Sequence, residues 1–193
     1  LEYFKSKDIT VPNITSWKLG CDFHEVENIT SKDTERVSNL KTKPYLLYVG
    51  TVEAKKNHVF TIEAMEKLWE KGSDLCLVIV GRGGYSQFTE KMHDNPELNK
   101  RLFFYDDVND DELYHFYNNC TGVVQLSKAE GFGLPLVEAS HYGKEIVCSD
   151  TAVFREVAGE YATYISLDDR APDQINDWYE SYKSGKRIDS SSM

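Results

Sequence analysis

The sequence predicts an α/β domain with a doubly wound, Rossmann-like parallel sheet. Short, continuously apolar runs alternate along the chain with amphipathic segments, which is typical of strand–helix–strand units. The runs are apolar at successive positions, so helices are expected to cover both faces of the sheet. The predicted strands span residues 45–49, 75–80, 102–105, 122–126, 146–148 and 162–165.

The helices between these strands are predicted from the spacing of apolar residues and from end signals. Val59, Ile62, Met65 and Trp69 are spaced to share one helical face, and Asn57 is the expected N-cap of that helix. The remaining helices are expected at residues 85–99 with a break near Pro96, and at 110–117, 134–142, 153–157 and 172–183.

Changes in polarity divide the chain into segments. Residues 21–43 are polar and rich in Asn, Ser and Asp, so we expect a linker with at most one short helix. Residues 44–185 carry the alternating pattern and form the predicted domain. The serine-rich residues 186–193 are expected to be a flexible tail. Residues 14–20 alternate weakly and predict one more short strand, so the opening of the chain resembles the end of a preceding domain.

Composition and charge limit the classes of function. The 193 residues include 22 Lys and Arg against 32 Asp and Glu, which gives a net charge of −10. General nucleic-acid binding needs a basic face, so we expect no nucleic-acid partner. No apolar run reaches the roughly 18 residues of a membrane span, and no signal-peptide pattern is present, so the expectation is a cytoplasmic protein.

The cysteines predict core thiols and no zinc site. They are Cys21, Cys76, Cys120 and Cys148, and the last three lie in or beside predicted strands. No C-x-x-C pair or Cys/His cluster occurs.

The stretch from Glu130 to Ala139 combines a glycine loop with the start of a helix. It follows the predicted strand at 122–126, and Pro135 suits the first turn of a helix. A helix N-terminus presents free N–H groups and partial positive charge to an anion. Glu130 and Glu138 bracket this position, and their carboxylates can accept hydrogen bonds from sugar or ribose hydroxyls. The alternative is an ordinary strand–helix turn with two surface acids.

The turn from Gly50 to His58 is the second candidate. Lys55 and Lys56 lie between a predicted strand and a predicted helix, where a lysine can pair with a diphosphate. The alternative is a solvated charge pair. Both turns fall on the carboxyl edge of the predicted sheet, which favours one shared anion site.

Two further motifs carry weaker signals. Gly81-Arg82-Gly83-Gly84 lacks the third glycine of a dinucleotide fingerprint, so a flexible turn that admits a substrate is the preferred interpretation. The acidic residues at 106–111 suggest a metal site, but helix capping with a solvated acidic turn explains them better. No nucleophile–histidine arrangement is present. We therefore expect no metal and no cofactor.

Together these residues resemble the C-terminal, nucleotide-sugar-binding half of a GT-B glycosyltransferase of retaining family 4. Residues 130–138 are similar to the family's E-x7-E motif, and residues 50–57 to its G-x-x-x-x-R/K-K-N loop. The resemblance covers roughly residues 44–169. It implies that residues 1–20 are the tail and linker of an N-terminal acceptor domain that is missing here.

The resemblance implies a role for each matching position. Lys56, and Lys55 beside it, would bind the donor diphosphate. Glu138 would accept from the ribose, and Glu130 would contact the donor sugar. As catalytic residues we predict Glu130 and Lys56; the other donor-binding positions are Gly50, Thr51, Val108, Gly131, Phe132, Gly133 and Leu134.

Two positions depart from the family pattern. Many members have Arg where this chain has Thr51, so the lysine pair would carry more of the phosphate charge. Glu145 stands where relatives usually have Pro.

The resemblance also implies a reaction. The donor-binding domain would support hexose transfer with retention of configuration, to a glycan or lipid-linked acceptor held by the missing domain. GDP-mannose is the first choice of donor because residues 50–57 are most like bacterial mannosyltransferases, and a UDP-sugar is next. Such an acceptor would make peripheral attachment to the inner face of the membrane plausible. The isolated fragment is expected to be poorly active or inactive.

Two alternatives remain open at this stage. One is a nucleotide-binding module without catalysis, which intact Glu130, Glu138 and Lys56 disfavour. The other is a sugar-nucleotide epimerase on the same architecture, which would need acid–base residues of its own.

Overall fold

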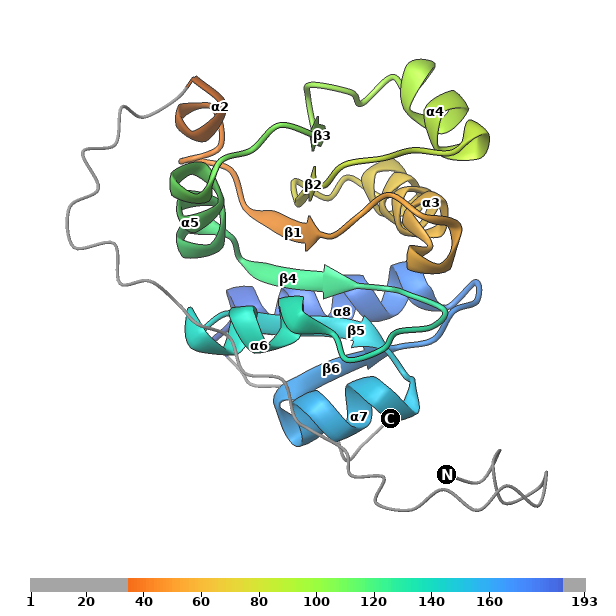
Figure 1. Cartoon of the computed structure of the whole chain (residues 1–193), viewed down its shortest axis with the longest axis vertical. Helices are drawn as coiled ribbons and strands as arrows, with labels where there is room; N and C mark the ends of the chain where they lie inside the picture. The colour runs from red at the N-terminus through yellow and green to blue at the C-terminus, as the bar shows by residue number, and fades with distance from the viewer. Residues whose placement is uncertain (1–34, 186–193) are drawn as a thin grey trace, which may run out of the picture.

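A computed structural model of the chain describes residues 35–185 (Figure 1). Its centre is a six-stranded sheet with the order β3-β2-β1-β4-β5-β6. All neighbouring strands run parallel. The strands are β1 (Tyr45–Val49), β2 (Cys76–Val80), β3 (Leu102–Tyr105), β4 (Gly122–Gln125), β5 (Glu145–Ser149) and β6 (Ala162–Ile165).

The strand order reverses between β1 and β4. From β1 the chain builds outward to β3, then returns to place β4 on the other side of β1 and continues to β6. Ligands of such sheets bind at this reversal, outside the carboxyl ends of the strands. The two strands pair over only two positions, Leu46 with Gly122 and Leu47 with Val123, whereas β1 and β2 pair over five.

Helices cover both faces of the sheet, as the apolar strands require. On one face α3, α4 and α8 pack over side chains such as Leu46 and Ile79. On the other face α2, α5, α6 and α7 pack over side chains such as Leu47 and Val78. The helices are α2 (Glu35–Ser38), α3 (His58–Glu70), α4 (Ser86–His93), α5 (Asp110–Asn119), α6 (Leu134–His141), α7 (Ala152–Ala158) and α8 (Ala171–Lys183), with short 3-10 turns η1 (Ala54–Lys56) and η2 (Gly159–Tyr161).

The doubly wound parallel sheet is confirmed, the extent of one helix is wrong, and one cap is right in position only. The helix expected over 85–99 ends at His93. After it, the Asn95 side chain accepts from the Glu97 amide (3.0 Å), and Asn99 has a left-handed φ of 62°. Asn57 is the N-cap residue of α3, as predicted, but it makes no side-chain capping hydrogen bond: its φ is 61°, and its side chain donates to the Leu126 carbonyl (3.1 Å).

Several expectations fall on residues 1–34 and 186–193, outside the described part of the chain. They are the preceding-domain tail at 1–20, the strand at 14–20, Cys21 and the tail at 186–193. Within the expected linker, α2 is the short helix that the sequence allowed, and it buries Val37. Leu40 is also buried, so residues 35–43 contribute to the core of the domain.

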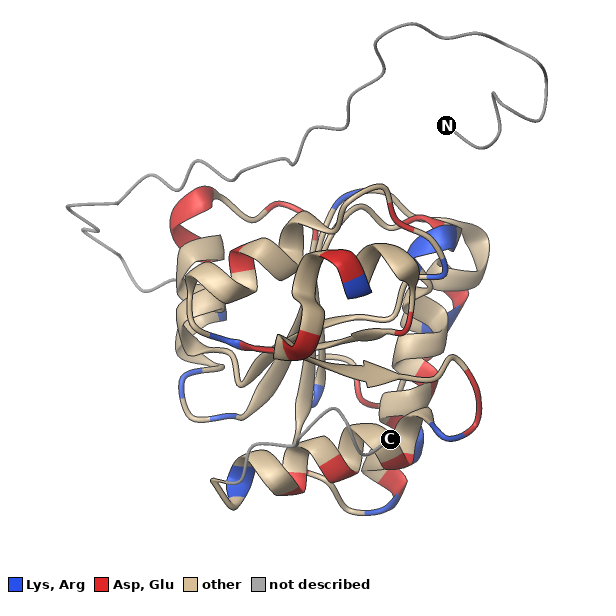
Figure 2. Cartoon of the chain, turned by 90° about the horizontal axis from the view of Figure 1, so that it is seen from below, with Lys and Arg blue, Asp and Glu red and all other residues tan. Residues whose placement is uncertain are grey.

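Basic residues are scattered among acidic ones on the surface, in the view of Figure 2.

The cysteines that the structure describes are core thiols, as the sequence predicts. Cys76, Cys120 and Cys148 are buried and free, and burial raises the pKa of the Cys148 thiol to about 12. Across residues 35–185, no helix has the length and apolarity to cross a bilayer.

Gly81 explains part of the glycine-rich turn after β2. A Cβ added there would lie 1.8 Å from the carbonyl oxygen of Gly50, so the turns after β1 and β2 can meet only without a side chain at this position. The Gly81 amide also donates to the Tyr105 carbonyl (3.0 Å), which fixes its backbone. Close packing of two backbone segments is thus one reason for this glycine.

We expect Gly81→Ala to destabilise the domain by about 2 kcal/mol or more, because overpacking against fixed backbone cannot relax cheaply. Urea unfolding would measure it. Gly84→Ala is the matched control, since an added Cβ there meets its nearest atom at 3.8 Å. Equal unfolding midpoints for the two variants would contradict the packing argument.

Candidate functional site

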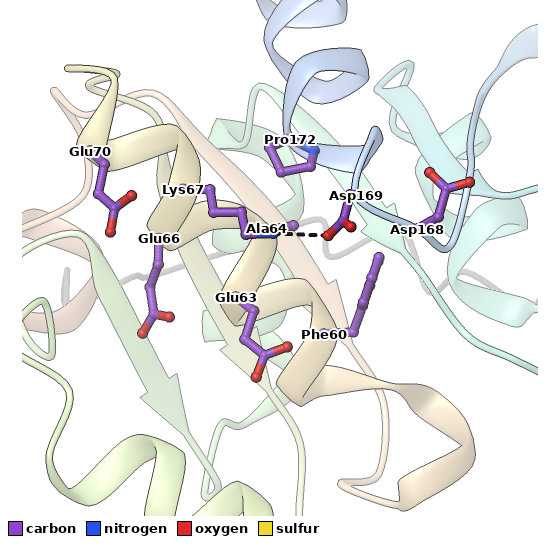
Figure 3. A pocket seen from close by; sticks show the side chains of 9 residues that line it. All are labelled: Phe60, Glu63, Ala64, Glu66, Lys67, Glu70, Asp168, Asp169 and Pro172. Carbon is purple, nitrogen blue, oxygen red and sulfur yellow. Dashed lines mark hydrogen bonds and ion pairs between the residues drawn. The ribbon is translucent and has the colours of Figure 1, made fainter.

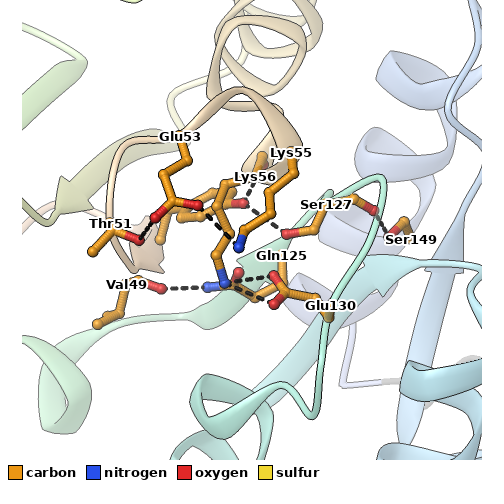
Figure 4. A network of polar contacts seen from close by, with 10 residues as sticks. Val49, Thr51, Glu53, Lys55, Lys56, Gln125, Ser127, Glu130 and Ser149 are labelled. Atoms are coloured by element: carbon orange, nitrogen blue, oxygen red, sulfur yellow. Dashed lines mark hydrogen bonds and ion pairs between the residues drawn. The ribbon is translucent and has the colours of Figure 1, made fainter. Parts of the chain in front are cut away.

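The turns after β1 and β4 lie side by side at the carboxyl edge of the sheet (Figure 4). The Lys128 amide donates to the Lys55 carbonyl (2.9 Å), which joins the two turns through the backbone. The bond from Asn57 to the Leu126 carbonyl joins them a second time. The two candidate motifs therefore share one place, as the topology predicted.

An ion pair between Lys56 and Glu130 crosses this junction. Lys56 Nζ lies 2.7 Å from both carboxylate oxygens of Glu130. The side chains are only 15% and 7% exposed, so each charge has lost much of its hydration and depends on the other. The pair sets an ammonium and a carboxylate beside the glycine loop.

A network of buried side-chain hydrogen bonds supports the turn that carries Lys56. Tyr48 donates to the Lys56 carbonyl, and its hydroxyl lies 3.1 Å from Ser127 Oγ. Ser149 Oγ donates to the Ser127 carbonyl (2.6 Å), and Gln125 Nε2 donates to the Val49 carbonyl (2.8 Å). Burial raises the pKa of Tyr48 well above its ordinary value, so this phenol keeps its proton and remains a donor.

Lys55 takes a different position from Lys56. Its side chain is 57% exposed and pairs with Glu53 at 3.0 Å. Thr51 Oγ1 donates to the same carboxylate (3.1 Å). Thr51, Glu53 and Lys55 thus form an exposed chain of contacts in the turn that follows Gly50 (Figure 4).

The glycine loop leads into α6 without a side-chain cap. Gly133 is the N-cap residue with a φ of 92°, and a Cβ there would lie 2.7 Å from the Phe154 ring. Both the backbone angle and the Phe154 contact therefore require glycine. Pro135 lies in the first turn as predicted, and Gly131 and Leu134 are exposed. Phe132 is half-buried.

The remaining predicted residues lie apart from the ion pair. Glu138 is half-buried on α6 and accepts a hydrogen bond from the Tyr117 hydroxyl. Val108 packs against the core on the α5 side of the sheet. Neither residue touches Lys56 or Glu130 through a hydrogen bond or ion pair. The structure therefore brings together Lys55, Lys56 and Glu130 with the glycine loop, and leaves Glu138 and Val108 on the flank toward α5.

The acidic turn at 106–111 is explained by capping and pairing. Asn109 and Glu112 form a reciprocal capping box at the start of α5. Asp107 pairs with Arg36 of α2 at 2.7 Å, and Arg36 lies over the Tyr105 ring. Within residues 35–185, no group of three or more His, Cys, Asp or Glu side chains could hold a metal ion.

Sequence reasoning missed the supporting residues. Tyr48 and Gln125 lie within apolar strands, where sequence alone gives no sign of their hydrogen bonds, and Ser127 belongs to no motif. His58 is fully buried against Tyr48, with ring centroids 4.3 Å apart. Burial, and then the Lys56 charge, lower the pKa of His58 to about 4, so the ring is neutral and belongs to the core.

A hollow of about 510 Å³ lies elsewhere, between α3 and the loop before α8 (Figure 3). It contains none of the predicted site residues. Five carboxylates and Lys67 line it, and Lys67 pairs with Asp169 at 3.1 Å.

Relatives of known activity match most of the chain. It is 37% identical over 179 residues to the serotype-specific mannosyltransferase WbdA of Escherichia coli, covering 88% of this chain and 22% of that protein. It is 26% identical over 176 residues to the O-antigen chain mannosyltransferase RfbU of Salmonella typhimurium, covering 91% and 46%. The chain thus spans less than half the length of these relatives.

Solved structures show the same fold. The pneumococcal O-GlcNAc transferase GtfA, in complex with UDP and GlcNAc, superposes with a TM-score of 0.58 at 20% identity, covering 76% of this chain and 30% of that one. The structural neighbours of this chain are GT-B glycosyltransferases, so its doubly wound domain is of a kind that occurs in that architecture.

The model of the family "Glycosyl transferases group 1" matches residues 31–190, which include the ion pair, the glycine loop and every strand of the sheet. The chain therefore belongs to the group 1 glycosyltransferases.

Proposed function

We propose that this chain is the donor-binding part of a retaining glycosyltransferase that transfers a hexose from a nucleotide diphosphate sugar. The observation that carries the proposal is the Lys56–Glu130 pair beside the uncapped start of α6, at the reversal point of the sheet. This arrangement offers one group for a phosphate, one for a sugar hydroxyl and backbone N–H groups for a second phosphate.

The proposed chemistry is stabilisation of a leaving group. Breaking the bond between sugar and diphosphate places negative charge on the phosphate oxygens. Lys56 and the N-terminus of α6, at Gly131 to Leu134, would oppose that charge without a metal ion. Lys55 would exchange its ion pair with Glu53 for one with the same phosphates, since its side chain is largely exposed. Glu130 would accept hydrogen bonds from the donor sugar.

The nucleoside would lie along the flank toward α5. Glu138 would accept from the ribose, and Val108 would lie near the base. GDP-mannose is the donor we propose first, supported by the mannosyltransferase names of the relatives. A UDP-sugar is second, supported by the UDP bound to the GtfA neighbour.

The acceptor would be a glycan or lipid-linked glycan held by a separate domain. The proposal is supported by the greater length of the relatives, of which the chain covers 22% for WbdA and 46% for RfbU. Retention would proceed by attack on the same face of the sugar without an enzyme nucleophile. On its own, the chain would bind donor and transfer sugar slowly or not at all.

Calorimetry against GDP, UDP, GDP-mannose and free mannose tests the donor site directly. We expect a nucleotide to bind and free mannose not to bind detectably. The outcome that sinks the proposal is failure of every nucleotide to bind.

Lys56→Ala should weaken GDP binding about tenfold or more, because a charge-assisted hydrogen bond contributes about 1.5–3 kcal/mol. The matched control is Lys128→Ala, which removes an exposed lysine from the neighbouring turn. Thermal melts would establish that both variants are folded. Equal losses in the two variants would mean that only net charge matters.

Glu130→Gln should weaken recognition of the donor sugar without weakening binding of the diphosphate. Removing the carboxylate frees Lys56 from its partner, so GDP should bind equally well or up to about threefold more tightly. The extra affinity of GDP-mannose over GDP should shrink, because the acceptor for sugar hydroxyls is weaker. Calorimetry with both ligands gives the ratio, and an unchanged ratio would remove Glu130 from the sugar site.

A further inference from the structure

The Glu138 carboxylate accepts a hydrogen bond from a phenol on the neighbouring helix. The Tyr117 hydroxyl on α5 donates to Oε2 of Glu138 on α6. Among residues 35–185 this hydroxyl is the hydrogen-bond partner of the carboxylate, and Oε1 has none. One oxygen of Glu138 is therefore occupied and the other is available.

The Tyr117 ring is fixed by its surroundings. It is 1% exposed and stacks on Tyr142, with centroids 5.0 Å apart and planes 15° apart. The Tyr142 ring in turn meets the Tyr114 ring edge-on at 5.8 Å. The Tyr142 amide donates to the Glu138 carbonyl (3.0 Å), so the turn that carries Glu138 also holds the stacked ring.

The phenol acts as a donor only. Burial raises the pKa of Tyr117 well above its ordinary value, and the negative charge of Glu138 raises it further. Tyr117 is therefore protonated at neutral pH, and its hydrogen bond to the carboxylate is charge-assisted.

We propose that Tyr117 is a positioning residue for the nucleotide ribose: by holding Oε2 of Glu138, it keeps Oε1 in place as the acceptor for the ribose hydroxyls. This inference rests on the proposed function, in which Glu138 binds the ribose. The terminal torsion of a glutamate is broad, so an untethered carboxylate must be ordered when the ligand binds. A tethered one is ordered beforehand, which strengthens binding of ligands that use it.

The test compares Tyr117→Phe with the parent chain, using GDP and 2′,3′-dideoxy-GDP in calorimetry. We expect Tyr117→Phe to bind GDP about 3–10-fold more weakly, the equivalent of one net hydrogen bond, and dideoxy-GDP without change. Tyr114→Phe is the matched control on the same helix, and both affinities should stay at the parent values. UDP and 2′,3′-dideoxy-UDP form the second ligand pair.

Equal losses for the two ligands, or no loss for either, would overturn the inference, since a merely structural role cannot distinguish them. If circular dichroism shows Tyr117→Phe unfolded, Tyr142→Leu replaces it, and the same selective loss is expected from removal of the stack.

Glu138→Gln separates this inference from the proposed function. If Glu138→Gln discriminates between GDP and dideoxy-GDP but Tyr117→Phe does not, only the positioning role fails. If Glu138→Gln affects both ligands alike, or no nucleotide binds, the ribose role fails and the positioning role falls with it.

Discussion

The ion pair between Lys56 and Glu130 is the interaction on which the site depends. Its partners come from opposite sides of the point where the strand order reverses, Lys56 after β1 and Glu130 after β4. Each charge is largely removed from water, so removing either partner would leave the other as an uncompensated buried charge. The turns that carry these residues are held together by a backbone hydrogen bond, and Tyr48 of β1 donates to the turn that carries Lys56. The positions of the two charges are therefore fixed by the sheet.

The fold could be predicted from the sequence because its signals are local. Strands apolar on both faces, glycines after them and an alternation with helices leave few arrangements other than a doubly wound sheet. The E-x7-E stretch and the lysine turn then fall on one edge by topology alone. The different ion pairs of Lys55 and Lys56 could not be predicted. Lys55 pairs with Glu53, two residues away, whereas Lys56 pairs with Glu130, which is 74 residues away in the sequence.

The residues that support the Lys56 turn could not be predicted from the sequence for a related reason. Tyr48, Gln125 and Ser149 are read as strand positions, and their hydrogen bonds appear only when the strands are adjacent. Asn57 is a related case: it stands at the predicted N-cap position of α3, yet its side chain makes a tertiary hydrogen bond to the Leu126 carbonyl in place of a capping bond. Arg36 similarly lies in a stretch that reads as linker, and its pairing with Asp107 ties that stretch to the acidic turn before α5.

The short pairing between β1 and β4 has a consequence for cooperativity. The two halves of the sheet share only two register positions, after which the Gln125 side chain, rather than a strand ladder, bridges to Val49. The pairing of β1 with β4 is thus the shortest strand pairing of the sheet. A ligand that contacts Lys56 after β1 and the start of α6 after β4 would connect the two halves of the sheet across this short pairing. Its binding free energy would then be linked to the unfolding of the whole domain and not to the ordering of one turn.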